Sequence, residues 1–211
     1  MLKCQIFLLF LIPVTFLYGQ TKDNVLWASF KVQKKLDQKT SLALAPILRL
    51  NDDLSNYQNF SIDLSIKRKI AKEWSLQLLG RTWFIPDAKI RQFLWLDVIF
   101  SKRLKNFNIA SNVRLHYALD LFGNKDSDFI RWKTTLKLLT LGKIQPFISI
   151  EPWFQLNGQN SFRQIRYEPG LSYKINDKFG LLAMYRRQAT IDIEPEINFN
   201  MIVVTLSYML P

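Results

Sequence analysis

The nine residues Asn59–Lys67, with the sequence NFSIDLSIK, alternate between polar and apolar side chains without interruption. The apolar positions are Phe60, Ile62, Leu64 and Ile66. Because successive side chains of a β-strand point to opposite faces, this stretch predicts a strand with one apolar and one polar face.

The same alternation recurs along the chain from residue 25 onward and predicts eleven strands. These are Val25–Leu36, Lys39–Leu50, Tyr57–Lys67, Glu73–Ile85, Ile90–Lys102, Phe107–Leu119, Phe129–Thr140, Ile144–Leu156, Arg163–Ile175, Phe179–Gln188 and Ile197–Leu210. Most of them span 10 to 14 residues. Strands of soluble domains usually have about five or six residues, whereas a tilted strand needs about nine to eleven to cross a membrane. The strand length therefore favours membrane-spanning strands.

The connections between these segments fall into two sets that alternate along the chain. Short basic connections, such as Arg68–Lys72 and Lys102–Asn106, alternate with longer polar or acidic ones, such as Asn51–Asn56 and Leu121–Asp128. Short turns at one end and longer loops at the other are typical of outer-membrane barrels. We therefore predict an all-β fold, an antiparallel up-and-down transmembrane β-barrel that forms a single domain over residues 21–211. The predicted strand count is ten to twelve, because eleven segments are visible and bacterial single-chain barrels have even counts.

Aromatic residues near the strand ends predict girdles at the two membrane interfaces. They include Trp27, Trp74, Phe84, Phe107, Tyr117, Phe129, Trp153, Phe179 and Tyr208. Four prolines lie inside predicted strands, where a closed barrel has no free edge to accommodate a missing N–H. They are Pro46, Pro146, Pro152 and Pro169, and we expect them to mark bulges or strand ends.

Residues 1–20, MLKCQIFLLFLIPVTFLYGQ, have the pattern of a secretory signal peptide. Lys3 supplies the basic start, and the apolar run Ile6–Tyr18 is shorter than the roughly 20 residues of a membrane-spanning helix. We predict that this segment is cleaved and that the protein is exported to the outer membrane. Its expected partners there are outer-membrane lipid, lipopolysaccharide and the barrel assembly machinery. Cleavage removes Cys4, the single cysteine, so the mature chain has none to form a disulfide.

The chain is basic and apolar at once, with 29 Lys+Arg against 17 Asp+Glu and 48% hydrophobic residues. The aromatic content of 14% excludes a disordered polyelectrolyte. A strongly basic chain often binds nucleic acid, but the signal segment and the interspersed charges argue against that partner. Many of the cations lie in the short turns, where they are placed to contact lipid phosphates.

Several short segments carry a resemblance to a known family. They are Trp27, Lys34-Lys35-Leu36, Arg49, Pro146–Glu151, Arg166, Gly170–Lys174 and Met184–Gln188. They resemble segments of an uncharacterised outer-membrane β-barrel family, a domain of unknown function, from the Bacteroidetes group. The resemblance covers most of the chain after the signal segment. It implies a barrel fold and an outer-membrane location, and it brings no activity.

If the apolar face contacts lipid, the opposite face lines the lumen. The charged residues that fall on this face are Arg49, Asp63, Lys67, Arg81, Asp97, Arg114, His116, Lys133, Glu151, Arg166 and Glu168. Counting along the hairpins places Arg114 within one or two layers of Asp97, and Glu151 near Lys133. Charges in a small lumen are costly unless they are paired or hydrated.

Two interpretations of these lumen charges stay open. In the first, ion pairs plug the bore and the protein is structural. In the second, the lumen is a narrow pore or a binding cavity, and its positive charge favours small anionic solutes. Ten to twelve strands lie between the filled interior of about eight strands and the open channel of about sixteen. This size argument favours the plugged interpretation.

Two other functions are considered. A barrel enzyme acting on lipid or peptide would use His116 as a base oriented by Asp97 or Asp120, but no serine has a suitable spacing, so we expect no enzyme. A soluble periplasmic ligand-binding β-protein also fits the alternation. The single histidine and the absence of clustered carboxylates predict no metal site, and no glycine-rich phosphate loop indicates a cofactor.

Overall fold

The computed structural model describes residues 24–51, 53–86, 90–119, 128–139, 141–156, 161–191 and 198–211. The predicted signal peptide over residues 1–20 and the proposed orienting residue Asp120 lie outside these ranges. Within the described ranges, no helix is long and apolar enough to cross a membrane.

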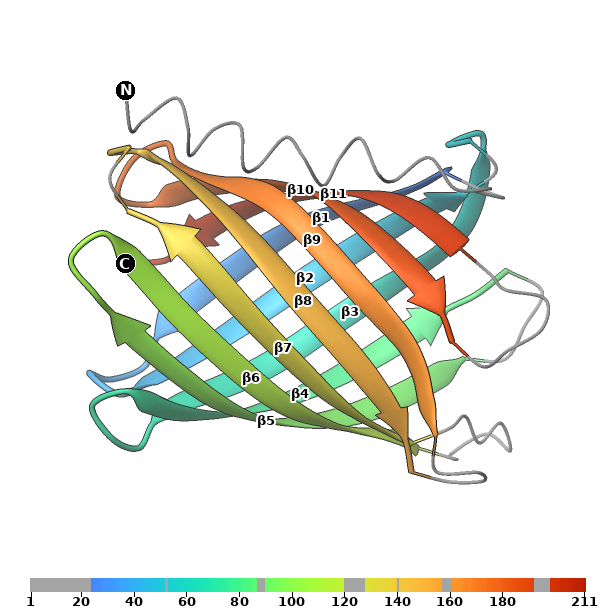
Figure 1. Cartoon of the computed structure of the whole chain (residues 1–211), viewed down its shortest axis with the longest axis horizontal. Helices are drawn as coiled ribbons and strands as arrows, with labels where there is room; N and C mark the ends of the chain where they lie inside the picture. The colour runs from blue at the N-terminus through green and yellow to red at the C-terminus, as the bar shows by residue number, and fades with distance from the viewer. Residues whose placement is uncertain are drawn as a thin grey trace.

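The described chain forms eleven β-strands, and the prediction of an all-β fold with ten to twelve strands is confirmed. The strands are β1 (Asn24–Lys35), β2 (Thr40–Asn51), β3 (Asn56–Lys69), β4 (Trp74–Phe84), β5 (Arg91–Arg103), β6 (Phe107–Leu119), β7 (Phe129–Leu138), β8 (Ile144–Gln155), β9 (Phe162–Lys174), β10 (Phe179–Thr190) and β11 (Asn198–Met209). They wrap around a common axis as one closed barrel in which neighbours in sequence are neighbours in space (Figure 1).

The barrel closes with a parallel pair of strands. β1 pairs with β11 from Asn24↔Asn200 to Gln33↔Met209, and both strands run in the same direction. In an up-and-down barrel each strand reverses the direction of the one before, so an odd number leaves the first and last strands parallel. The prediction of antiparallel pairing is therefore correct for every pair but the closing one. β1 consequently begins at the end of the barrel opposite to the end where β11 finishes (Figure 1).

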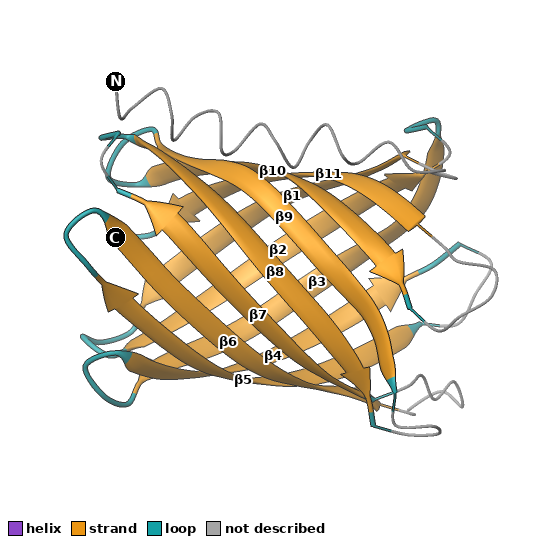
Figure 2. Cartoon of the chain, in the orientation of Figure 1, coloured by secondary structure: helices purple, strands orange, loops and turns teal. Residues whose placement is uncertain are grey.

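Short turns join the strands at one end of the barrel (Figure 2). In the turn between β1 and β2, the Asp37 carboxylate accepts hydrogen bonds from the backbone N–H groups of Lys39 and Thr40, each at 2.6 Å. These hydrogen bonds hold the pKa of Asp37 below its usual value, and the one from the backbone N–H of Lys39 has the largest effect. In the turn between β9 and β10, the side-chain oxygen of Asn176 accepts hydrogen bonds from the backbone N–H groups of Lys178 and Phe179 in the same way. Asp and Asn favour turns because their side chains make these local bonds.

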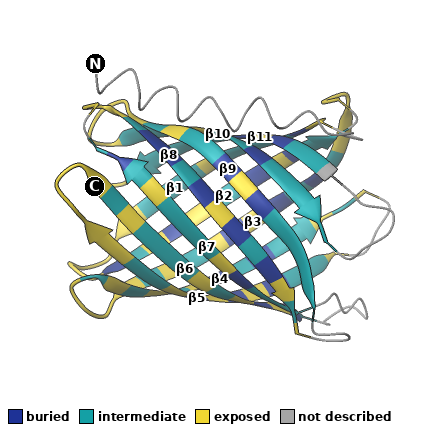
Figure 3. Cartoon of the chain, viewed as in Figure 1, coloured by how far each residue is buried: buried dark blue, intermediate teal, exposed yellow. Residues whose placement is uncertain are grey.

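The outer face of the barrel is apolar, and its interior combines buried charged residues with buried aromatic and aliphatic ones, such as Trp95 and Val203. In β3, Ser61 and Asp63 are buried, while Ile62 and Leu64, which alternate with them, are exposed. Buried and exposed positions alternate in the same way over much of β5 and in part of β2, whereas most positions of β1 and β10 are partly buried (Figure 3). A soluble domain buries its apolar face, so this arrangement is the reverse of an ordinary core.

The expectation that the prolines mark bulges or strand ends is met at Pro146, near the start of β8, and at Pro152, next to a register shift between Trp153 and Phe154. Pro46 and Pro169 lie within continuous strands. The register of the β1–β2 pairs has a gap beside Pro46, and similar gaps adjoin Pro152 on the β7 side and Pro169 on the β10 side. Proline has no N–H to donate to the ladder. At each of these three prolines the pairing with one neighbouring strand is interrupted, while the pairing with the neighbouring strand on the other side continues.

Candidate functional site

Two bidentate ion pairs join neighbouring strands inside the barrel. Arg81 donates from Nε and Nη2 to the two carboxylate oxygens of Asp63, at 2.5 and 2.6 Å. Arg114 binds Asp97 in the same way, with both distances 2.6 Å. The members of each pair are directly opposite in register. Because an arginine fork matches a carboxylate, both side chains are fixed in place. The predicted proximity of Arg114 and Asp97 is confirmed.

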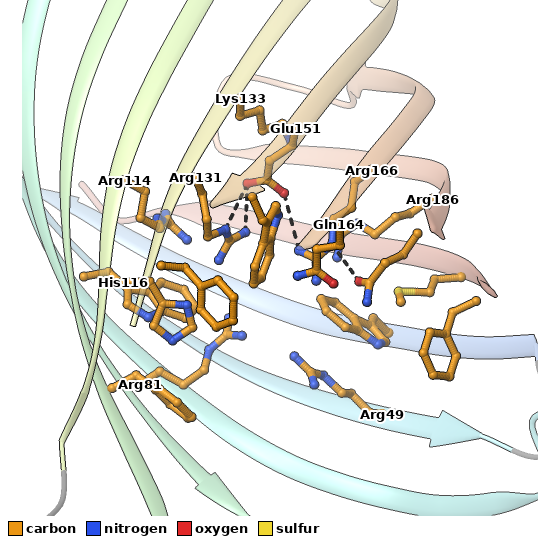
Figure 4. A pocket seen from close by; sticks show the side chains of 18 of the residues that line it. Arg49, Arg81, Arg114, His116, Arg131, Lys133, Glu151, Gln164, Arg166 and Arg186 are labelled. Carbon is orange, nitrogen blue, oxygen red and sulfur yellow. Dashed lines mark hydrogen bonds and ion pairs between the residues drawn. The ribbon is translucent and has the colours of Figure 1, made fainter. Parts of the chain in front are cut away.

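Glu151 on β8 binds an arginine on each neighbouring strand. Arg131 donates to Oε1, with Nη2 at 2.8 Å, and Arg166 donates to Oε2 from Nη1 at 3.4 Å (Figure 4). Lys133 was expected near Glu151, and this is confirmed, because the register of β7 against β8 places the two residues opposite each other (Figure 4). The ion pair of Lys133 is nevertheless with Glu168. The reason is that the long lysine side chain reaches across β8 from β7 to β9.

Glu168 is completely buried and accepts two cations. Arg186 of β10 and Lys133 of β7 each donate to one of its carboxylate oxygens. Together with the pairs of Asp63, Asp97 and Glu151, these contacts form a belt of ion pairs inside the barrel. Every carboxylate of the belt is therefore already bound by at least one protein cation.

Arg49 lies inside the barrel but makes no ion pair with a carboxylate among the described residues, and its guanidinium group has aromatic neighbours instead. Its Cζ lies 3.7 Å from the ring centroid of Trp27 and 4.7 Å from that of Trp83. The residue is 6% exposed, and its Nε has no hydrogen-bond partner among the described residues. Arg49 is thus a buried cation stabilised by cation–π contacts.

The interior contains a cavity of about 690 Å³. Its charged lining consists of Arg49, Arg81, Arg91, Arg114, Arg131, Lys133, Arg166 and Arg186, with Glu151 as the one carboxylate in the described part of the lining. The residues at its outer edge come from the first residues of β1, β5, β7 and β11, so the cavity lies in the half of the barrel next to the longer loops. We call it the arginine chamber.

An aromatic wall borders the arginine chamber. It consists of Trp83, Phe93, Trp95, His116, Phe129 and Trp153. Trp83 packs against Phe93 at a centroid distance of 4.8 Å, and Phe129 packs against Trp153 at 5.5 Å. His116 joins these pairs, because its ring contacts the rings of Phe93, Trp95, Phe129 and Trp153. Arginines also stack on this wall, such as Arg131 over Trp153 at 3.8 Å. The wall therefore offers apolar surface directly beside cationic groups.

Residues 24–196 match a family described as a protein of unknown function (DUF2490). The chain belongs to this family. The match extends from the first residue of β1 to just before β11, so it includes almost the whole barrel. It does not test the bacterial group suggested by the resemblance. No curated protein matches the chain.

The predicted girdle of aromatic residues needs a correction. Trp27, Phe129 and Trp153 line the arginine chamber instead of facing outward. Trp74 and Tyr117 are exposed, as a girdle would require. The difference arises because both faces of these strands carry aromatic residues. The nearness of an aromatic residue to a strand end therefore does not reveal whether its ring points into the barrel or outward.

His116 lies within the aromatic wall. Phe93 and Trp95 pack against its ring at centroid distances of 5.1 Å each. Neither ring nitrogen has a hydrogen-bond partner in the described part of the protein. Asp97, proposed to orient it, is instead engaged by both donors of Arg114. A catalytic base needs an orienting group and a nucleophile within reach; Asp97 is not free to orient His116, and Asp120 lies outside the described residues.

The structure gathers most of the predicted lumen residues into one site. Arg49, Arg81, Arg114, His116, Lys133, Glu151 and Arg166 line the arginine chamber, and Asp63, Asp97 and Glu168 are buried as ion-pair partners. Lys67 is only partly buried on β3 and does not line the chamber. In the described residues, no group of three His, Cys, Asp or Glu side chains is placed to bind a metal ion.

Sequence reasoning missed two arginines of the belt. Arg131 precedes Lys133 by two residues and so shares its face, a signal that the alternation already contained. Arg186 adjoins Arg187, and two consecutive cations do not reveal which of them points inward. Its assignment required the register of β10 against β9.

Proposed function

We propose that this protein is an outer-membrane β-barrel whose arginine chamber admits small anionic solutes. The observation that carries the proposal is the charge of the chamber, which is lined by eight cationic residues and one carboxylate among its described residues. The carboxylates of the belt are all bound to protein cations, and Arg49 has no carboxylate partner within the described part of the chain. Lumen cations favour anions along a path or in a cavity.

The outer surface supports a membrane location. Large apolar side chains are exposed over the middle of the strands, including Leu44, Leu64, Leu96, Leu115 and Ile202. Soluble monomers rarely expose apolar patches larger than a few hundred Å². Lipid removes this cost, and strands of 10 to 14 residues are long enough to cross a bilayer. Within this proposal the signal peptide directs export, the barrel assembly machinery inserts the chain, and outer-membrane lipid and lipopolysaccharide surround it.

The ion pairs and the cavity have complementary roles in this proposal. The belt holds the arginines in fixed positions by cross-strand contacts, such as Arg81 with Asp63. The chamber beside the belt leaves space for a solute next to these cations. A solute would enter from the end with the longer loops, since the chamber lies in that half of the barrel.

The test is the ion selectivity of the purified protein in planar lipid bilayers under a potassium chloride gradient. We expect discrete conductance steps, and we expect the sign of the reversal potential to show that chloride passes in preference to potassium. Replacing Arg91, which lines the outer edge of the chamber, with glutamine should shift this potential toward zero. The Lys72→Gln variant in an exposed turn is the control and should behave as the wild type. Silence over repeated insertions, or a preference for potassium, would refute passage of anions.

A further inference from the structure

We infer that the arginine chamber contains a saturable binding site for an anion that carries a planar ring, with Arg49 as its charged anchor. The inference rests on the proposed function, because it names the class of solute that the chamber takes. The charge of the chamber implies only a general preference for anions, whereas this inference adds one specific binding site.

The anionic group of the ligand is indicated by the state of Arg49. The guanidinium groups of Arg81 and Arg114 are each occupied by a carboxylate, whereas Arg49 is stacked between Trp27 and Trp83. A buried cation without a counter-charge is costly, and stacking on rings recovers only part of that cost. A phosphate or carboxylate of a bound solute would supply the missing counter-charge at the guanidinium group of Arg49, which lines the chamber.

The ring of the ligand is indicated by the wall next to Arg49. Trp83 contacts the guanidinium group of Arg49 and also packs against Phe93, so it joins the anchor to the aromatic wall. The indole Nε1 atoms of Trp83, Trp95 and Trp153 are buried and have no hydrogen-bond partner among described residues. These Nε1 atoms do not open onto the chamber, so the wall offers a solute its ring faces, which suits a flat aromatic group.

The size of the chamber agrees with a solute larger than an inorganic ion. Sites for small molecules usually measure about 300–1,000 Å³ and combine an apolar lining with a few placed polar groups. The chamber, at about 690 Å³, falls within that range. An inorganic anion would neutralise Arg49 but leave the aromatic wall in contact with water. A solute with both a ring and an anionic group would satisfy both features.

The experiment is a titration of tryptophan fluorescence in the detergent-solubilised full-length barrel, with phenyl phosphate as the probe. Trp27 and Trp83 contact Arg49, so occupancy should change their emission. We expect a saturable change with phenyl phosphate and at least tenfold weaker binding of inorganic phosphate. The Arg49→Gln variant should bind phenyl phosphate at least tenfold more weakly, whereas the exposed-turn variant Lys72→Gln should bind as the wild type does.

Two further measurements keep the result interpretable. Circular dichroism of Arg49→Gln establishes that the barrel is intact, and Arg49→Lys, which keeps the charge but loses the planar stack, should bind with intermediate affinity. A linear, unsaturable response, or an equal response in Arg49→Gln and wild type, overturns the inference. Equal affinity for inorganic phosphate overturns its ring requirement. Chloride-selective conductance without saturable binding overturns this inference while the proposed function stands.

Discussion

Replacing Leu64 with arginine is expected to destabilise the barrel in lipid by about 2–4 kcal/mol. Leu64 lies near the middle of β3 with 53% of its surface exposed. If the outer face contacts lipid, an arginine there is placed in the hydrocarbon interior, where a charge is costly. The measurement is urea-induced unfolding in lipid vesicles, followed by tryptophan fluorescence.

Ile70 provides a matched control for this variant. Its side chain is 56% exposed, but it lies in the short turn after β3 instead of within a strand. The Ile70→Arg variant should keep wild-type stability, because the turn lies at the end of the barrel. If Leu64→Arg changes stability as little as Ile70→Arg does, the middle of the barrel faces water and the membrane proposal is wrong.

Replacing Glu168 with glutamine is expected to cost about 3–5 kcal/mol of unfolding free energy. The variant keeps the shape of the side chain but leaves Arg186 and Lys133 without their carboxylate inside the barrel. Glu168 is 0% exposed, so solvent cannot replace the lost charge. Equilibrium unfolding by urea, compared with the wild type in the same detergent, measures the loss.

A double variant separates the loss of the pair from general damage to the barrel. Glu168→Gln combined with Arg186→Gln removes both charges and should recover part of the lost stability, since one unpaired cation is eliminated. The Asp177→Asn variant removes the carboxylate of an exposed turn pair with Lys174 and should have no measurable effect. Full stability of Glu168→Gln alone would show that the belt does not hold the strands together.

The strands were predictable because alternation is a local property. The segment Val25–Leu36 was expected, and β1 spans Asn24–Lys35. The parallel closure was not predicted, although eleven segments were visible, because bacterial single-chain barrels have even strand counts and the predicted count was therefore left at ten to twelve. Eleven strands in an up-and-down order already require a parallel closing pair.

The site was only partly predictable, because its contacts depend on different ranges of sequence. Asp97 and Arg114 face each other across one hairpin, so counting back from the turn brings them together. The pair of Lys133 and Glu168 crosses an intervening strand, which hairpin counting does not reach. The isolation of Arg49 was the least accessible feature, because it depends on where every carboxylate inside the barrel finds its partner.

Cell fractionation of the expressed protein is the most direct test of whether the apolar face contacts lipid while the arginines face a chamber. We expect the protein in the outer-membrane fraction, where it should stay after washing with alkaline carbonate and be released only by detergent. Recovery in the periplasmic fraction without detergent would contradict the account and favour a soluble ligand-binding β-protein.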